Sequence, residues 1–135
     1  PNVYVHGAMP HQQVMDEFFP SLDLFCLPTK QEMAGFVFAE AAAAGVPAIT
    51  YASGGTAELV RHEQTGYVVP QGDEAGFVAA IRSLLNDVDR RHAFGLQART
   101  LAEREYEHHQ HFQRLFDSIM DGISNPRPSP VSRQH

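Results

Sequence analysis

Short apolar segments alternate along this chain with longer stretches of helical periodicity. A run of a few apolar residues that is bounded by turn-forming residues predicts a β-strand. Four segments have this pattern: Val3–Val5, Leu22–Leu27, Val46–Tyr51 and Gly66–Val69. The dipeptide His6-Gly7 ends the first segment, Pro28 closes the second, and Ser53–Gly55 predicts a turn shortly after the third.

Five segments between and after these strands predict helices. They are His11–Phe19, Phe36–Ala44, Thr56–Arg61, Glu74–Leu85 and Arg90–Ile123. Pro20 is expected to stop the first helix, and Gly45 is a candidate C′ glycine for the second. Asp73 can cap the amino end of the fourth helix, and Gly95 is a candidate break within the last.

Short strands that alternate with helices predict an α/β fold. We expect a Rossmann-like, doubly wound parallel sheet with helices on both faces, followed by a long C-terminal helical region. The chain opens at Pro1, directly before an apolar segment, so we expect a partial domain over residues 1–123 with its amino-terminal part missing and residues 90–123 helical. Residues 124–135 carry Pro126, Pro128 and Pro130 and predict a disordered tail.

Composition and charge exclude several classes of function. The net charge is −6 and the ten Lys and Arg residues are scattered, so the chain lacks the basic patch that nucleic-acid binding requires. Neither an apolar run long enough to span a membrane nor a signal peptide is present. The single cysteine, Cys26, lies in an apolar segment and predicts a buried, unreactive thiol, which fits a cytoplasmic protein.

Residues Thr29–Glu40 carry the candidate chemistry. They lie between the carboxyl end of a predicted strand and the start of the next helix, where doubly wound folds bind their ligands. Gly35 permits close approach of the backbone, and the first amides of the helix have no partner within the helix. These amides and the helix dipole can bind a diphosphate without a lysine.

Two carboxylates flank this predicted anion site. Glu32 precedes the helix, and Glu40 lies about one turn inside it. Carboxylates repel phosphates but accept hydrogen bonds from paired hydroxyls. We therefore expect them to bind the sugars on either side of a diphosphate, and a nucleotide-sugar has this layout.

The order of these residues resembles a known family. Glu32 and Glu40 form a Glu–x7–Glu pattern, and further matching positions surround it: Pro28, Gly35, Ala41, Gly45–Ile49, Gly54-Gly55, Glu58 and Gly66. As a set they resemble the C-terminal, donor-binding domain of retaining GT-B glycosyltransferases of family 4, also called glycosyl transferases group 1. The resemblance extends from about Val3 to Leu85.

The resemblance implies the transfer of a hexosyl group from a nucleoside-diphosphate-sugar to an acceptor, with retention of anomeric configuration. Glu32 is then the catalytic candidate and contacts the donor sugar, while Glu40 binds the ribose. Backbone amides of Gly35, Phe36 and Val37 bind the distal phosphate and sugar. Residues around Gly7 and Met9 lie near the base. Ala34 stands where relatives carry Phe or Leu, which leaves the identity of the sugar open.

The same resemblance implies what these residues lack. The family needs no metal, and a basic pair that stabilises the leaving diphosphate comes from the missing part of the nucleotide domain. A separate amino-terminal domain binds the saccharide, lipid or small-molecule acceptor. We therefore expect these residues to bind nucleotide weakly and to transfer nothing by themselves. The sequence leaves open whether a longer parent lies at the cytoplasmic membrane.

Other interpretations compete with this one. A GT-B-like nucleotide-sugar epimerase shares the carboxylate-rich sugar site, and a non-catalytic α/β interaction module shares the fold. The histidines His108, His109 and His111 suggest a solvated helix face more than a metal site, because no third ligand is near. His6 and His11 could line the cleft but are simplest as turn residues. The last helix carries an apolar stripe for which core packing is the simplest prediction and docking on a partner domain the alternative: Phe112, Leu115, Phe116, Ile119 and Ile123.

Overall fold

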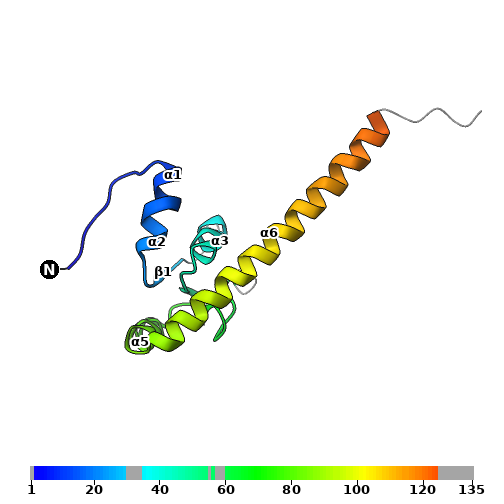
Figure 1. Cartoon of the computed structure of the whole chain (residues 1–135). Coiled ribbons are helices and arrows are strands. Elements are labelled where there is room, and N and C mark those ends of the chain that lie inside the picture. Colours follow the sequence, from blue (N-terminus) through cyan, green and yellow to red (C-terminus); the bar gives the residue numbers. More distant parts are fainter. Residues whose placement is uncertain (1, 30–34, 55, 57–59, 125–135) are drawn as a thin grey trace, which may run out of the picture. The chain divides into compact units, whose positions relative to one another are not determined.

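The structure is a computed structural model that describes residues 2–29, 35–54, 56 and 60–124. It divides into two compact units, Pro1–Glu103 and Arg104–His135. The predicted tail lies outside the described residues except for Ser124, which ends the last helix. Figure 1 shows the order of the elements along the chain.

Three parallel strands form the sheet of the first unit. They are β1 (Phe25–Leu27), β2 (Ala48–Tyr51) and β3 (Gly66–Val69), adjacent in that order. The register aligns Cys26 with Ile49 and Ile49 with Tyr67. Three of the four predicted strands are therefore confirmed, two of them shorter at their amino ends than their apolar segments.

Helices cover both faces of this sheet. On one face Ile49 and Tyr51 pack with Phe77 of α5 (Glu74–Asn86) and Phe94 of α6 (Val88–Ser124). On the other face, Ala48 packs against Phe38 of α3 (Gly35–Ala43) and against Val60, which follows the loop after β2. All four residues of β2 are buried, because a central parallel strand has no solvent face. The predicted α/β fold with helices on both faces is confirmed.

The predicted strand Val3–Val5 does not form. Residues 2–10 have no regular structure, and Val3, Tyr4 and Val5 are 83%, 80% and 95% exposed. A strand exists only when it pairs with a neighbour, and β1 pairs only with β2 among the described residues. An apolar segment of three residues therefore indicates strand propensity, but it does not show whether a neighbouring strand is available to pair with it.

The first helical segment continues through the proline that was expected to stop it. It consists of α1 (His11–Gln13), the π-helical turn η1 (Val14–Phe18) and α2 (Phe19–Ser21). The amide of Phe19 donates to the carbonyl of Val14, five residues back, directly before Pro20. The wider turn accommodates the proline, which would clash with a carbonyl in a regular α-helix. Phe19 is buried and packs with Ala41 of α3.

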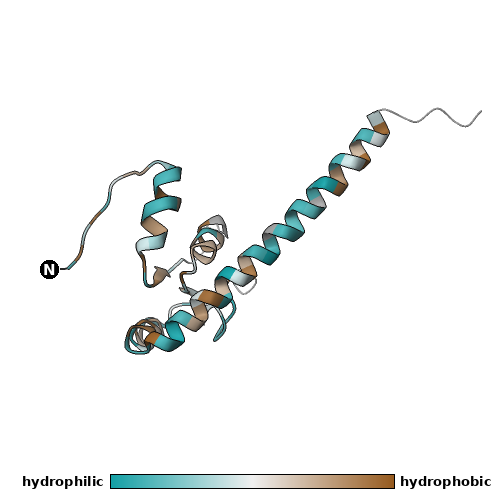
Figure 2. Ribbon diagram, viewed as in Figure 1, coloured by the Kyte–Doolittle hydropathy of each residue, from teal (hydrophilic) through white to brown (hydrophobic). Residues whose placement is uncertain are grey.

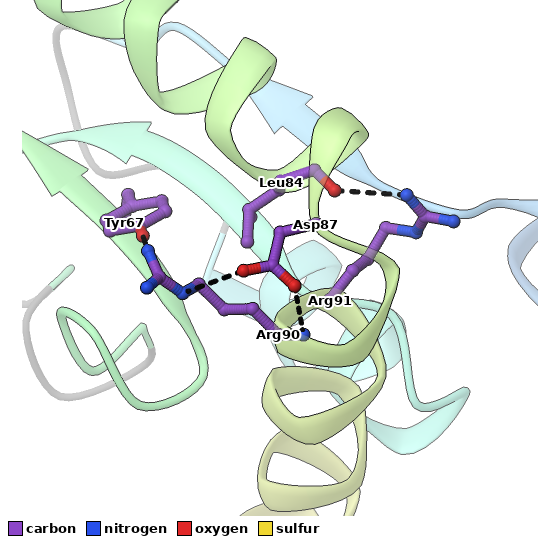
Figure 3. Close-up of polar contacts among 5 residues, drawn as sticks. All are labelled: Tyr67, Leu84, Asp87, Arg90 and Arg91. Atoms are coloured by element: carbon purple, nitrogen blue, oxygen red, sulfur yellow. Dashed lines mark hydrogen bonds and ion pairs between the residues drawn. The ribbon is translucent and has the colours of Figure 1, made fainter.

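The junction between α5 and α6 is held by arginines (Figure 3). Arg91 donates from Nη1 to the carbonyl of Leu84 at 3.0 Å, in the last turn of α5. The carboxylate of Asp87 accepts from the Arg90 amide at 3.0 Å, and its other oxygen lies 3.6 Å from Arg90 Nε. Arg90 Nη1 reaches the hydroxyl of Tyr67 on β3 at 3.2 Å, which ties the junction to the sheet.

Predicted helix boundaries at α3 and α5 are confirmed. Asp73 accepts a hydrogen bond from the amide of Gly76 at 2.9 Å and caps α5. Gly45 follows α3 with a φ of +74°, as a C′ glycine requires. The predicted break at Gly95 is wrong, because α6 passes this residue as a continuous helix. A Cβ at Gly95 would collide with the carbonyl oxygen of Gly45, so glycine here allows close backbone contact.

The turn before β3 covers the outer edge of that strand. Glu63 has a φ of 60°, which folds the chain back so that its amide donates to the carbonyl of Gly66 at 2.9 Å. The amide of Val68 donates to Nδ1 of His62 at 3.1 Å. Two backbone groups that point away from β2 thus find partners within the same turn.

In the second unit, α6 carries the apolar stripe on its surface. Leu115, Phe116, Ile119 and Ile123 are 49–69% exposed, so the prediction that they pack in a core is wrong for them, and the side chain of Phe112 lies outside the described residues. Figure 2 shows apolar and polar residues interspersed along this helix. Among the described residues of its own unit, which end at Ser124, nothing covers the stripe. Among the described residues, no helix is both long and apolar enough to span a membrane.

Candidate functional site

The carboxyl ends of the three strands lie at one edge of the sheet. Tyr51 pairs with Val69, and Leu27 pairs with Thr50, so the strands end nearly level with one another. The loops that follow them therefore begin side by side. In parallel α/β sheets this edge holds the ligand, and the segment predicted to bind one follows β1.

Helix α3 presents its amino end after that loop. It begins at Gly35, so Gly35, Phe36 and Val37 form its first turn and their amides have no acceptor within the helix. The side chain of Val37 is half-buried and packs against the cluster that contains Phe19. Its backbone amide belongs to the first turn of the helix. This is the geometry expected for an anion site at a helix terminus. Residues 30–34, among them Glu32 and Ala34, lie outside the described residues, so the role of Glu32 stays a prediction.

Glu40 lies one turn beyond this helix start. Its side chain is 24% exposed, and its Oε1 lies 3.8 Å from Nε2 of His11. The contact joins α3 to the first residue of α1, which precedes it by a long stretch of sequence. Sequence reasoning placed Glu40 correctly on the helix but treated His11 as a turn residue. No local pattern signals a pair that only the packing of α2 on α3 brings together.

The loop after β2 adds hydroxyl groups to the same edge. Thr56 is buried, its Oγ1 accepts from the amide of Ser53 at 3.0 Å, and its own amide donates to the carbonyl of Ser53 at 2.8 Å. Gly54 has a positive φ of 37°, which closes the predicted turn. The hydroxyl oxygen of Ser53 is buried, and no described atom hydrogen-bonds to it. Gly55 and residues 57–59, including Glu58, are outside the described part of the chain.

The two residues predicted near the base, Gly7 and Met9, lie in the irregular segment before α1. The predicted strand that should have positioned them is absent there, and a Cβ at Gly7 would meet nothing within 4 Å. Met9 is half-buried and precedes the helix that carries His11. Their role at the base stays a prediction.

Nucleophilic or metal chemistry has little support in the described residues. Burial raises the pKa of the Cys26 thiol to about 11, so it is protonated and unreactive at neutral pH. Within the described ranges, no group of three or more His, Cys, Asp or Glu side chains is arranged to hold a metal ion.

The chain is similar to known proteins over most of its length. The family model described as "Glycosyl transferases group 1" matches residues 1–101. A glycogen synthase of Mycobacterium tuberculosis is 46% identical over 81 residues, which cover 60% of this chain and 19% of that protein. The sulfoquinovosyl transferase SQD2 of Arabidopsis thaliana is 30% identical over 93 residues, covering 67% and 18%.

A third relative and a solved structure extend the comparison. A GDP-mannose-dependent phosphatidylinositol monomannoside mannosyltransferase of M. tuberculosis is 40% identical over 84 residues, covering 57% of this chain and 22% of that protein. The structure of sucrose-phosphate synthase from Thermosynechococcus elongatus superposes with a TM-score of 0.62 at 27% identity, over 75% of this chain and 27% of that one. The chain thus spans about a fifth of the length of these curated relatives.

Proposed function

Since the chain belongs to the glycosyl transferases group 1 family, we propose that it forms the donor-binding part of a longer hexosyltransferase. The donor is a nucleoside-diphosphate-sugar, and the sugar passes to an acceptor with retention of anomeric configuration. The relatives are named for transferases and synthases, which favours this reading over an epimerase or an interaction module. The observation that carries the proposal is the start of α3 at the carboxyl edge of the sheet, with Glu40 one turn inside.

In the proposed complex, the donor lies across the amino end of α3. Backbone amides of Gly35, Phe36 and Val37 bind the diphosphate, and the helix dipole offsets its charge. The carboxylate of Glu40 accepts hydrogen bonds from the ribose hydroxyls. Glu32 contacts hydroxyls of the transferred sugar, and Gly7 and Met9 lie near the base. The ligand therefore lies along the helix start, with one sugar on each side of its phosphates.

The chemistry follows from this orientation. As the bond from the sugar to the diphosphate breaks, positive charge develops on the sugar and negative charge on the leaving oxygen. The α3 amides face that leaving oxygen and stabilise it without a metal. We propose that the remaining positive charge, and the site for a saccharide, lipid or small-molecule acceptor, come from parts of the parent outside these residues.

Glutamate-to-glutamine variants separate the two proposed roles. Glu40→Gln should raise the Kd for uridine or guanosine diphosphate, whichever binds, by roughly five- to tenfold, because glutamine keeps an acceptor oxygen but loses the charge, and a hydrogen bond to a charged group is worth about 1 kcal/mol more than a neutral one. Glu32→Gln should leave that Kd within about twofold and weaken only binding of the corresponding nucleotide-sugar. Affinities are measured by NMR titration of the 135-residue chain, in which weak binding is detectable.

The matched control is Glu103→Gln, an exposed glutamate on α6 that should leave both affinities unchanged. Failure of the wild-type chain to bind either nucleotide would overturn the proposal. Equal losses from both glutamate variants would overturn the division of roles between them.

A further inference from the structure

The contact between His11 and Glu40 lies at the margin of the proposed nucleotide site. His11 is the first residue of α1, and its side chain is 74% exposed. The Nε2 to Oε1 distance of 3.8 Å is within the range of an ion pair but longer than a hydrogen bond. The imidazole therefore faces the carboxylate without occupying the lone pairs that a ribose diol would use.

Core packing, not a chance side-chain conformation, positions this histidine. The helical segment that begins at His11 is anchored by Phe19, which packs with Ala41 and Val46 around the carboxyl end of α3. The amide of Val14 donates to the carbonyl of Pro10 at 3.1 Å and closes the first turn. The backbone of His11 is thus held beside α3 by contacts that do not involve its own side chain.

Neighbouring carboxylates on the same helical segment have partners of their own. Asp16 accepts from Gln12 at 2.7 Å, and Glu17 accepts from Gln13 at 3.3 Å. Each of these pairs lies along the helical segment itself, whereas His11 reaches across to α3. Among the described carboxylates, that of Glu40 lies within ion-pair distance of the His11 imidazole.

Ribose binding would remove water from the carboxylate of Glu40. When a nucleotide covers the carboxylate, it removes water, and an uncompensated charge then costs free energy. A cation beside the carboxylate offsets part of this cost and limits the directions in which the carboxylate can turn. Both effects favour a carboxylate with its oxygens directed at the ligand.

We propose that His11 is a positioning residue for nucleotide binding, which acts through Glu40 and not through direct contact with the phosphates. The inference rests on the proposed function, because Glu40 must bind the ribose for His11 to matter. The expected effect is small, since exposed ion pairs contribute little. Loss of the imidazole should weaken nucleotide binding by roughly two- to fivefold.

A charge-specific test uses two replacements of His11. In a buffer of pH 6.0, His11→Gln should raise the Kd for the nucleoside diphosphate by roughly two- to fivefold. His11→Lys should keep the Kd within about twofold of the wild-type value, because lysine restores the cation. The same substitution at an exposed histidine of α6, His92→Gln, serves as the control and should have no effect.

A double-mutant cycle tests whether His11 acts through Glu40. In a Glu40→Gln background, adding His11→Gln should weaken binding no further. A full effect of His11→Gln in that background, or failure of lysine to restore binding, would overturn the inference while leaving the proposed function intact. Absence of nucleotide binding in the wild-type chain would overturn both, so the two failures are distinguishable.

Discussion

Gly45 and Gly95 meet backbone to backbone where α6 packs on the turn after α3. Gly45 adopts a φ of +74°, and a Cβ at Gly95 would collide with its carbonyl oxygen. On either side of this contact, Phe94 and Ala98 are buried. The close approach therefore fixes how the first part of α6 packs within the first unit. It also explains why glycine, which disfavours helices, stands inside this helix.

Gly95→Ala should destabilise the chain despite the better helix propensity of alanine. Propensity favours alanine by up to about 1 kcal/mol, but overpacking against a backbone carbonyl costs about 1–3 kcal/mol. The free energy of unfolding, measured by urea denaturation with circular dichroism, should fall. Gly122→Ala on the same helix meets nothing within 4 Å and should be neutral or stabilising. Equal changes for the two variants would contradict this account of the contact.

For single residues, the sequence predicted the local role of a side chain better than its contacts with distant residues. Asp73 was identified as a cap from its place before a helical segment, because capping is decided by residues a turn apart. His11 and Glu40 are separated by three other elements, and their contact depends on how α2 packs on α3. A pattern along the chain contains no information about such a pair.

At the scale of the element, the end of α5 depends on a side chain from the next helix. The last carbonyls of a helix have no partner within it. Arg91, in the first turn of α6, donates to the carbonyl of Leu84 at 3.0 Å (Figure 3) and to that of Leu85 at 3.3 Å. The two helices are thus joined by a cap as well as by the short turn at Asp87.

Arg91→Ala should reduce the free energy of unfolding by about 1–2 kcal/mol, because two helix-terminal carbonyls lose a charged donor. Arg99→Ala is the matched control on the same helix. Its side chain is 63% exposed and pairs with Glu103, so its removal should cost no more than about 0.5 kcal/mol. Thermal and urea unfolding of the two variants give the comparison, and a smaller loss for Arg91→Ala than for Arg99→Ala would contradict the proposed cap.

The elements differ in how far the sequence determines them. Helices α3 and α5 were predicted to within a residue or two, since their caps and periodicity are local signals. Strands β1, β2 and β3 formed because each has a neighbour within the described sheet. Val3–Val5 has similar composition and formed no strand. Strand formation depends on pairing between distant segments, so composition alone predicts it less well.

For the molecule as a whole, the order of its motifs predicted the family, and periodicity predicted the layers of the fold. Helix α3 follows β1 as expected, and Glu40 lies one turn inside it. The stripe on α6 was expected to be buried and is exposed, because periodicity identifies an apolar face but not what covers it. The partner of such a face is a property of the assembled protein.

The 135-residue chain should bind nucleotide and yet transfer no sugar. It spans only about a fifth of the curated relatives' length, and the proposed acceptor site lies outside it. Incubation with a radiolabelled nucleotide-sugar and a range of acceptors should give no product above a no-protein blank. The 135 residues with the Glu40→Gln substitution provide a second blank. Product that depends on Glu40 would contradict the proposed division of labour between this chain and the rest of the parent.

The turn that covers β3 also bears on how the protein behaves in concentrated solution. Sheets can grow between molecules when an edge strand offers unpaired amides and carbonyls to another chain. At β3 the carbonyl of Gly66 and the amide of Val68 are already bound by Glu63 and His62. That edge therefore offers fewer free backbone groups for strand exchange or fibril-like stacking.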